Sequence, residues 1–311
     1  MPLPSVAVID VGSNSIKVLV ATRTSGGIIT PLHIRTIDAR ISAGISKTEP
    51  RLSDEGMARG LEAIRALLSD TTAFNPTRTI LVATSAVRDA ANGGDFLARV
   101  RSATGHSIRI LTGEEEAHLI GHGLTADPAL RTLQDFYVFD LGGGSLECLA
   151  FQNRTVRQAF SLPLGCVRLT EKFVPDMSKP MSRAAREQVI AFTREALARS
   201  AFTFSLPSTA VAVGTGGTVT TVRAILGARE GKDFAATSPV VSVGQMRELL
   251  EWLGGLSLAE RQQIPGLPPA RADVFPVALA TLLAVADAGS FTAFQNSVYN
   301  LRYGLAAEAL T

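Results

Sequence analysis

One short stretch limits the possible folds of this chain more than any other: Asp140-Leu141-Gly142-Gly143-Gly144-Ser145-Leu146-Glu147. The apolar runs on either side, 136–139 and 146–151, have the length and composition of buried strands. The stretch therefore predicts a hairpin turn between two strands. Glycines allow a tight turn and let backbone N–H groups approach an anion closely.

The acids at the two ends of this turn add a second chemical signal. Asp140 ends the first predicted strand and Glu147 lies just past the turn. Carboxylates beside backbone N–H groups suit a complex of magnesium with phosphate. A glycine triplet alone is a weak signal, because a flexible loop with an incidental aspartate has the same appearance.

The pattern recurs, and the recurrence makes the phosphate interpretation stronger. Near the N-terminus, an apolar strand leads into Asp10-Val11-Gly12-Ser13-Asn14-Ser15, and a second apolar run follows. A third version, with Gly214, Gly216 and Gly217, lacks the acid, follows an apolar run and opens a helix whose N-terminus suits phosphate. Two acidic turns about one domain apart predict an internal duplication, with two lobes that face each other across a cleft.

The length of 311 residues also predicts two domains. Strands and helices alternate along the chain, which favours α/β domains with parallel or mixed sheets. A polar stretch at 125–135 marks the boundary, so we expect domains at 1–124 and 125–302. The final helix, about 303–311, can pack onto the first domain.

Composition excludes several other classes of protein. A net charge of +2 argues against a surface that coats nucleic acid, and the longest apolar stretch contains Pro276 and is too short to cross a membrane. Cys148 and Cys166 stand in apolar contexts without metal-type spacing, which predicts buried free thiols. No signal-peptide pattern is visible at the first residues, so we expect a cytoplasmic protein.

Polar residues at the expected helix starts supply local signals. Ser53 is the predicted N-cap of a helix that begins near Asp54, and Ser85 that of a helix carrying Arg88. Thr112 and Glu115 form a capping box, so helix stability is sufficient to explain the presence of Glu115. Glu116 has no role in that box, and we expect it beside the cleft.

With these pieces in place, the chain resembles the exopolyphosphatase / guanosine pentaphosphate phosphatase (Ppx/GppA) family of the actin-like, ribonuclease H-like ATPase superfamily. Several separated motifs carry the resemblance: 8–15, 83–88 with Asn92 and 95–96, 113–117, 140–147, and 162–165. The resemblance implies two actin-like domains and removal of terminal phosphate from polyphosphate or guanosine pentaphosphate. It also suggests a homodimer.

The resemblance further implies roles for individual residues. Glu116 corresponds to the general base that activates water. Asp140 and Glu147 correspond to the acids associated with Mg²⁺ or Mn²⁺. The phosphate-contacting set comprises Asp10, Ser13, Asn14, Arg88, Gly142, Gly143, Gly144 and Ser145.

Some positions depart from the family pattern and leave alternatives open. His118 stands where arginine is common, and Asn300 and Tyr303 alter a C-terminal Gly-Leu-Arg-Glu-Gly motif. Longer members continue into further helical domains, so we expect this chain to favour short polyphosphate. A small-molecule kinase, which would form ADP, and a catalytically weak nucleotide sensor are the alternatives from other classes.

Overall fold

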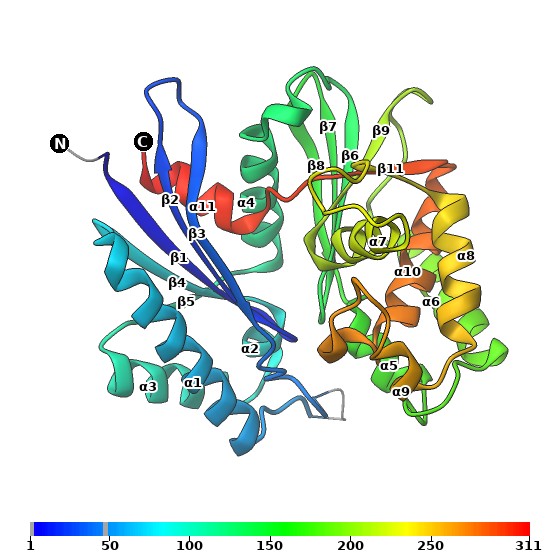
Figure 1. Ribbon diagram of the computed structural model, residues 1–311, viewed down its shortest axis with the longest axis horizontal. Helices are drawn as coiled ribbons and strands as arrows, with labels where there is room; N and C mark the ends of the chain where they lie inside the picture. Colours follow the sequence, from blue (N-terminus) through cyan, green and yellow to red (C-terminus); the bar gives the residue numbers. More distant parts are fainter. Residues whose placement is uncertain (1–2, 46–48) are drawn as a thin grey trace. The chain divides into compact units, whose positions relative to one another are not determined.

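The computed structural model describes residues 3–45 and 49–311. The first two residues, part of the region inspected for a signal peptide, lie outside the described residues, as do 46–48. The chain forms two compact units (Figure 1). Unit 1 consists of Met1–Thr132 and Tyr299–Thr311, and unit 2 of Leu133–Val298. The chain thus leaves unit 1, builds unit 2 and returns to complete unit 1.

A mixed sheet forms the centre of unit 1. Its strands are β1 (Ser5–Val11), β2 (Ile16–Arg23), β3 (Ile29–Ile37), β4 (Arg78–Ala83) and β5 (Ile108–Ile110). Their order across the sheet is β3-β2-β1-β4-β5. The first three strands are antiparallel, and β4 and β5 run parallel to β1. Because helices cover both faces of β1, it is an almost continuous apolar run.

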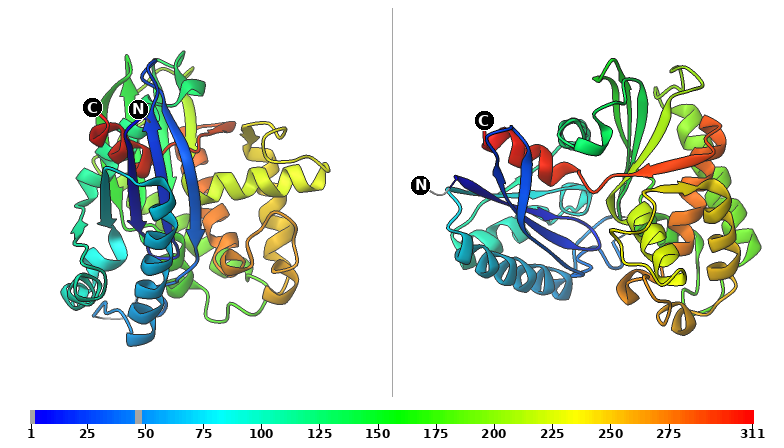
Figure 2. Two further views of the ribbon diagram at one scale, coloured as in Figure 1. Left: turned by 60° about the vertical axis from the view of Figure 1, so that its left-hand side comes forward. Right: turned by 45° about the horizontal axis from the view of Figure 1, so that its top comes forward.

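The helices of unit 1 pack on this sheet, except one, α4, whose main contact is with α11 (Figures 1 and 2). They are α1 (Asp54–Thr71), α2 (Ser85–Asp89), α3 (Gly93–Thr104), α4 (Gly113–Thr125) and α11 (Leu301–Ala309), with short 3-10 turns η1 (Thr72–Phe74) and η2 (Pro128–Leu130). Helices α4 and α11 touch through glycines: a Cβ on Gly123 would lie 2.2 Å from the Asn300 carbonyl oxygen, and one on Gly304 would lie 2.0 Å from that of Leu119. This close contact fixes the C-terminal helix in unit 1.

The sheet of unit 2 repeats the same order and then extends it. Its strands are β6 (Phe136–Leu141), β7 (Leu146–Gln152), β8 (Thr155–Leu162), β9 (Val211–Thr215), β10 (Val240–Ser242) and β11 (Ala293–Asn296). They lie in the order β10-β11-β9-β6-β7-β8. Again the first three strands are antiparallel and the next two, β9 and β11, are parallel to the first.

A buried helix is the centre of the unit 2 core. The helices are α5 (Cys166–Phe173), α6 (Arg183–Arg199), α7 (Gly216–Arg229), α8 (Val243–Gly254), α9 (Leu258–Arg261) and α10 (Phe275–Gly289), with the 3-10 turn η3 (Pro269–Arg271). Helix α10 contacts α5, α6, α7 and α8 and is buried along most of its length. A helix that is apolar all round has to be buried in this way. Pro276 lies in its first turn, where no intrahelical donor is lost.

The repeated strand order confirms the predicted pair of α/β domains with mixed sheets. Local signals also located many elements correctly, including the β1–β2 and β6–β7 hairpins, and Ser53, whose side chain accepts a hydrogen bond from the Gly56 N–H. Strand β8, helix α5 and the β10–β11 pair were not predicted. Both cysteines are buried and free, as expected.

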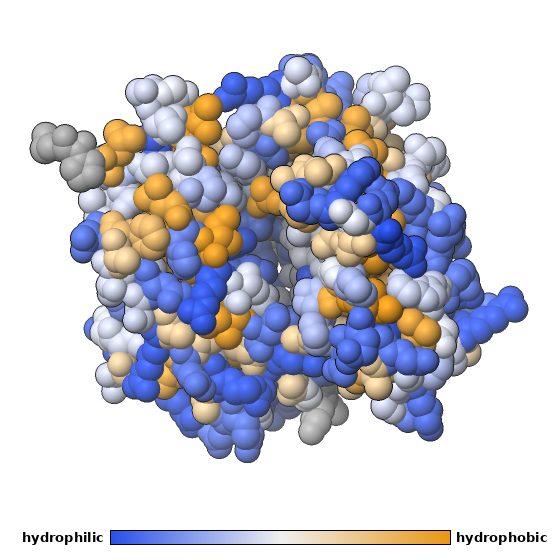
Figure 3. Space-filling model, in the orientation of Figure 1, coloured by the Kyte–Doolittle hydropathy of each residue, from blue (hydrophilic) through white to orange (hydrophobic). Residues whose placement is uncertain are grey.

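The outer surface shows no large apolar area on the face in Figure 3, where hydrophilic and apolar residues are interspersed. Large exposed apolar side chains are scattered and include Leu32, Ile34 and Trp252. Within residues 3–45 and 49–311, no helix is both long and apolar enough to cross a membrane.

Candidate functional site

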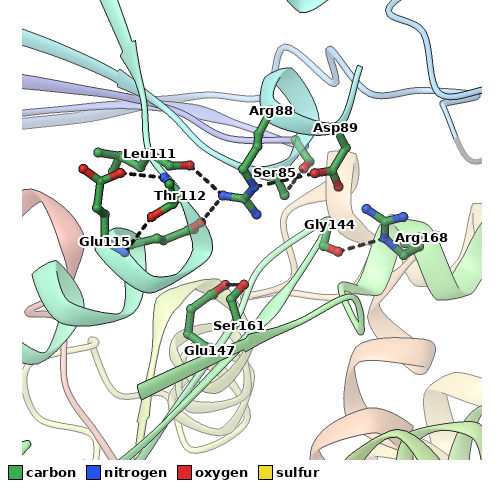
Figure 4. Close-up of polar contacts among 12 residues, drawn as sticks. Ser85, Arg88, Asp89, Leu111, Thr112, Glu115, Gly144, Glu147, Ser161 and Arg168 are labelled. Carbon is green, nitrogen blue, oxygen red and sulfur yellow. Dashed lines mark hydrogen bonds and ion pairs between the residues drawn. The ribbon is translucent and has the colours of Figure 1, made fainter. Parts of the chain in front are cut away.

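The β6–β7 turn is held from one side by the start of helix α5. The backbone N–H of Cys166 donates to the Gly142 carbonyl at 3.0 Å, and those of Val167 and Arg168 donate to the Gly143 carbonyl at 2.9 and 3.2 Å. The Arg168 Nε donates to the Gly144 carbonyl at 3.0 Å (Figure 4). These bonds satisfy the N–H groups that a helix start leaves without intrahelical partners.

This anchoring determines where the N–H groups of the turn point. In a planar trans peptide, the C=O and the N–H of the next residue point in opposite directions. Because the carbonyls of Gly142, Gly143 and Gly144 face α5, the N–H groups of Gly143, Gly144 and Ser145 face away from it. Within the described part of the chain, these three N–H groups have no acceptor. Successive N–H groups directed to one side form a cradle for an anion.

The β1–β2 turn in unit 1 is built in the same way from different residues. Gly12 N–H donates to the Ser15 carbonyl at 3.2 Å, as Gly142 does to Ser145 at 3.0 Å. The Arg40 N–H donates to the Asn14 carbonyl at 2.8 Å, and the N–H and hydroxyl of Ser42 donate to the Ser13 carbonyl at 3.3 and 3.1 Å. The N–H groups of residues 14 and 15 therefore also point away from their anchor.

The aspartates beside the two turns have ladder partners of opposite charge. Asp140 lies directly opposite Glu147 in the β6–β7 ladder, whereas Asp10 lies directly opposite Lys17 in the β1–β2 ladder. Directly opposed residues share a face of the sheet, so like charges there are destabilising and opposite charges stabilising. Glu147 is 1% exposed, and its Oε1 accepts a hydrogen bond from the Ser161 hydroxyl at 2.8 Å.

The donor set in unit 2 fits a hard divalent cation. Carboxylates are hard oxygen ligands, and Mg²⁺ typically uses one or two protein carboxylates together with water and substrate phosphate. No group of three or more His, Cys, Asp or Glu side chains with metal-site geometry exists among the residues described. In unit 1, the buried Oδ1 of Asp10 and of Asn14 lack a donor within the described residues.

Glu116 forms a partly buried ion pair in unit 1. Its Oε2 lies 3.0 Å from Nη1 of Arg88, and the same Nη1 donates to the Leu111 carbonyl at 2.9 Å. Glu116 is 7% exposed, although it lies in the first turn of α4 beside the exposed Glu114. Glu115 forms the predicted capping box with Thr112 (Figure 4), and the Thr112 N–H lowers the pKa of Glu115 by stabilising its charged form.

The N-terminus of α2 corrects one prediction. Thr84, not Ser85, is the N-cap residue, and its side chain makes no capping bond. The Ser85 hydroxyl instead lies 3.3 Å from that of Ser13 in the β1–β2 turn. This bond links the turn to the short helix that carries Arg88, so these predicted site residues belong to one region of unit 1.

Helix α7 brings the third glycine motif to the β6–β7 turn. Gly216 has φ = +76°, and a Cβ there would lie 2.0 Å from Oδ1 of Asp140. A Cβ on Gly217 would lie 1.8 Å from Nη1 of Arg271. Packing explains why residue 214 is a glycine, because a Cβ there would lie 2.4 Å from Cγ2 of Val219. Contact of Gly214 with phosphate stays a prediction.

Sequence reasoning missed three polar residues of this region: Ser161, Arg168 and Arg271. The apolar residues around them gave no chemical signal. Ser161 contacts Glu147, Arg168 contacts the Gly144 carbonyl, and Arg271 lies beside α7, so each contact joins separate elements. Arg168 belongs to a segment next to the quoted motif 162–165, which was the one available hint. Unit 2 therefore contributes more to the site than the glycine motif alone.

Comparison with known proteins decides the family. The model of the Ppx/GppA phosphatase family matches residues 19–311. The chain belongs to the Ppx/GppA phosphatase family. It is similar to the Ppx-GppA enzyme of Aquifex aeolicus, with 25% identity, 99% of this chain and 100% of that chain covered, and a TM-score of 0.79. It shares its fold with an exopolyphosphatase from Cytophaga hutchinsonii, with 23% identity, 98% and 97% coverage, and a TM-score of 0.88.

Membership in the Ppx/GppA family places the chain among phosphoanhydride hydrolases of the polyphosphate or guanosine pentaphosphate type.

The altered C-terminal motif has a structural explanation. Tyr303 is 2% exposed and packs against Tyr299, with ring centroids 4.0 Å apart. Burial raises the pKa of Tyr303 to about 12, so this side chain is neutral where the family pattern has a glutamate.

We predict that Gly216→Ala lowers phosphatase activity roughly a hundred-fold, because the new Cβ must displace the Asp140 carboxylate and a shift of about 1 Å can have that effect. The measurement is phosphate release from tripolyphosphate. Gly231→Ala is the matched control, since Gly231 has φ = +65° but no atom within 4 Å of its Cβ position. Equal activities of the two variants would mean that backbone strain alone explains Gly216.

Proposed function

We propose that the chain removes terminal phosphate from inorganic polyphosphate, with Glu116 as general base and a divalent cation held by Asp140 and Glu147. The observation that carries the proposal is the β6–β7 turn, where three N–H groups point away from α5 beside two directly opposed carboxylates. Donors of this kind offset the charge of a transferring phosphoryl group, and positioning supplies most of the rest of the catalysis.

The chain's own residues have separate tasks in this scheme. The N–H groups of 143–145 bind oxygens of the terminal phosphate. When bound, Mg²⁺ neutralises negative charge on the phosphate oxygens. The Glu116 carboxylate accepts a proton from water while the water oxygen bonds to the terminal phosphorus. The bridging P–O bond breaks, and its electron pair leaves with the shortened chain.

Three observations favour Glu116 over the neighbouring acids as the base. Glu114 is exposed, and Glu115 is occupied by the capping box. Glu116 is buried and held by Arg88, which fixes the position of its carboxylate. A general base needs such a fixed position, since proton transfer requires hydrogen-bond distance. Direct phosphate contact by Arg88 stays a prediction, because its Nη1 is bonded to Glu116 and Leu111.

We predict that Glu116→Gln lowers turnover of tripolyphosphate by about a hundred- to ten-thousand-fold, because glutamine keeps the shape but cannot accept the proton. Affinity for tripolyphosphate, measured by calorimetry, stays close to that of the wild type. Glu114→Gln, in the same helical turn but exposed, is the control. A fall of less than about tenfold would remove Glu116 from the role of base.

The same assay separates the alternative functions. Guanosine pentaphosphate also presents a terminal anhydride, so wild-type kcat/KM on it is compared with that on tripolyphosphate and long polyphosphate. A higher value for guanosine pentaphosphate would replace the proposed substrate, and ADP formation from ATP and a sugar would indicate a kinase. Preference for short chains, cytoplasmic location and homodimer assembly stay predictions.

We predict that chelation abolishes activity and that Mg²⁺ or Mn²⁺ restores it, because no cationic side chain is the ladder partner of Asp140. Asp140→Asn should raise the Mg²⁺ concentration for half-maximal activity by about tenfold or more, as expected for a lost contact to a charged group. Asp10→Asn, at the duplicate position opposite Lys17, should leave that concentration near the wild-type value. Full turnover in excess chelator would contradict the metal assignment.

A further inference from the structure

We propose that Arg168 is a positioning residue that aims the Ser145 N–H at the phosphate, through its hydrogen bond to the Gly144 carbonyl. The proposal rests on the proposed function of the β6–β7 turn. The Arg168 Nε lies 3.0 Å from the Gly144 oxygen, on the carbonyl side of the turn (Figure 4). The Ser145 N–H belongs to the same peptide group and points in the opposite direction.

Only one of the three anchoring sites on this turn relies on a side chain. Backbone N–H groups of α5 hold the carbonyls of Gly142 and Gly143. Gly165 allows this close approach, because a Cβ there would lie 2.2 Å from the Gly144 carbonyl carbon. The third carbonyl, that of Gly144, is held by the arginine side chain. The direction of the Gly144–Ser145 peptide therefore depends on the identity of residue 168.

Helix stability does not explain an arginine at this position. Arg168 is the third residue of α5, and a positive charge in the first turn of a helix opposes the helix dipole. Helical side chains lean back toward the N-terminus, which brings the Arg168 side chain onto the glycine turn. The hydrogen bond to the Gly144 carbonyl accounts for an arginine at position 168, which the helix dipole does not favour.

The duplicate turn in unit 1 supports the same reading independently. There the corresponding carbonyl, that of Asn14, is held by the Arg40 backbone N–H at 2.8 Å. Both units thus anchor the carbonyl of this peptide, so its orientation is the shared feature of the two turns. In unit 1 the anchor is backbone and insensitive to the side chain. In unit 2 it is a side chain, which makes the idea testable by substitution.

The test compares Arg168→Met with Arg168→Gln. The glutamine Nε2 is separated from the backbone by the same number of bonds as the arginine Nε, so glutamine can restore the donor without the charge, whereas methionine restores neither. The readouts are calorimetric affinity for tripolyphosphate with Mg²⁺ and hydrogen–deuterium exchange over 142–147. Arg199→Met is the control, because Arg199 is exposed and its ion pair is with Glu195, four residues earlier in the same helix.

We predict that Arg168→Met weakens tripolyphosphate binding about tenfold, the change expected for a lost hydrogen bond from a charged group, and speeds exchange in 142–147. Arg168→Gln should return both readouts most of the way to the wild-type values. Equal loss of affinity in the two variants, with unchanged exchange, would mean that Arg168 acts through its charge and would overturn the proposal.

The two proposals fail in different ways in this design. If wild-type protein does not bind tripolyphosphate, the proposed function fails, and the exchange comparison still decides the role of Arg168. Exchange over 142–147 that is the same in wild type, Arg168→Met and Arg168→Gln overturns the positioning role in every case. Melting temperatures show whether each variant is folded, and Arg168→Ala, which also lacks the donor, takes the place of Arg168→Met in the exchange comparison if Arg168→Met does not fold.

Discussion

The hydrogen bonds to the carbonyl side of the β6–β7 turn are the constraint on which the site depends. A peptide group cannot turn its C=O toward α5 without turning the following N–H away from it. The start of α5 and the Arg168 side chain therefore determine where the donors of the cradle point. The absence of a Cβ at Gly165 lets the helix reach the turn.

The two units use one architecture with different charges beside the turn. The strand order and the hairpin turn are shared, but the residue opposite the aspartate differs. The ladder partner of Asp10 in unit 1 is a lysine, whereas that of Asp140 in unit 2 is a glutamate, which sets two carboxylates side by side. Two neighbouring carboxylates favour a bound cation more than an opposed aspartate and lysine do. Unit 1 adds a buried carboxylate, Glu116, fixed by Arg88. The charge at one ladder position thus distinguishes the two turns, in addition to the different anchors of their carbonyls.

Local signals explain what could be predicted from sequence. Unbroken apolar runs located β1 and β6, and capping residues located α1 and α4, because both depend on neighbouring residues. Contacts between distant residues could not be predicted in the same way. The Arg88–Glu116 pair spans 28 positions, and α5 is recognisable as functional only once its N–H groups meet the glycine turn. Ser85 looked like a cap because serine favours that position, but tertiary packing placed its hydroxyl against Ser13 instead.

The most direct test of this account is an NMR measurement of backbone amides in deuterated wild-type protein, titrated with inorganic phosphate in the presence of Mg²⁺. The account predicts the largest shifts of the amide proton at Gly143, Gly144 and Ser145, because these N–H groups would exchange water for phosphate oxygens as acceptors. Phosphate binding that shifts amides elsewhere but leaves those three resonances unchanged would contradict it.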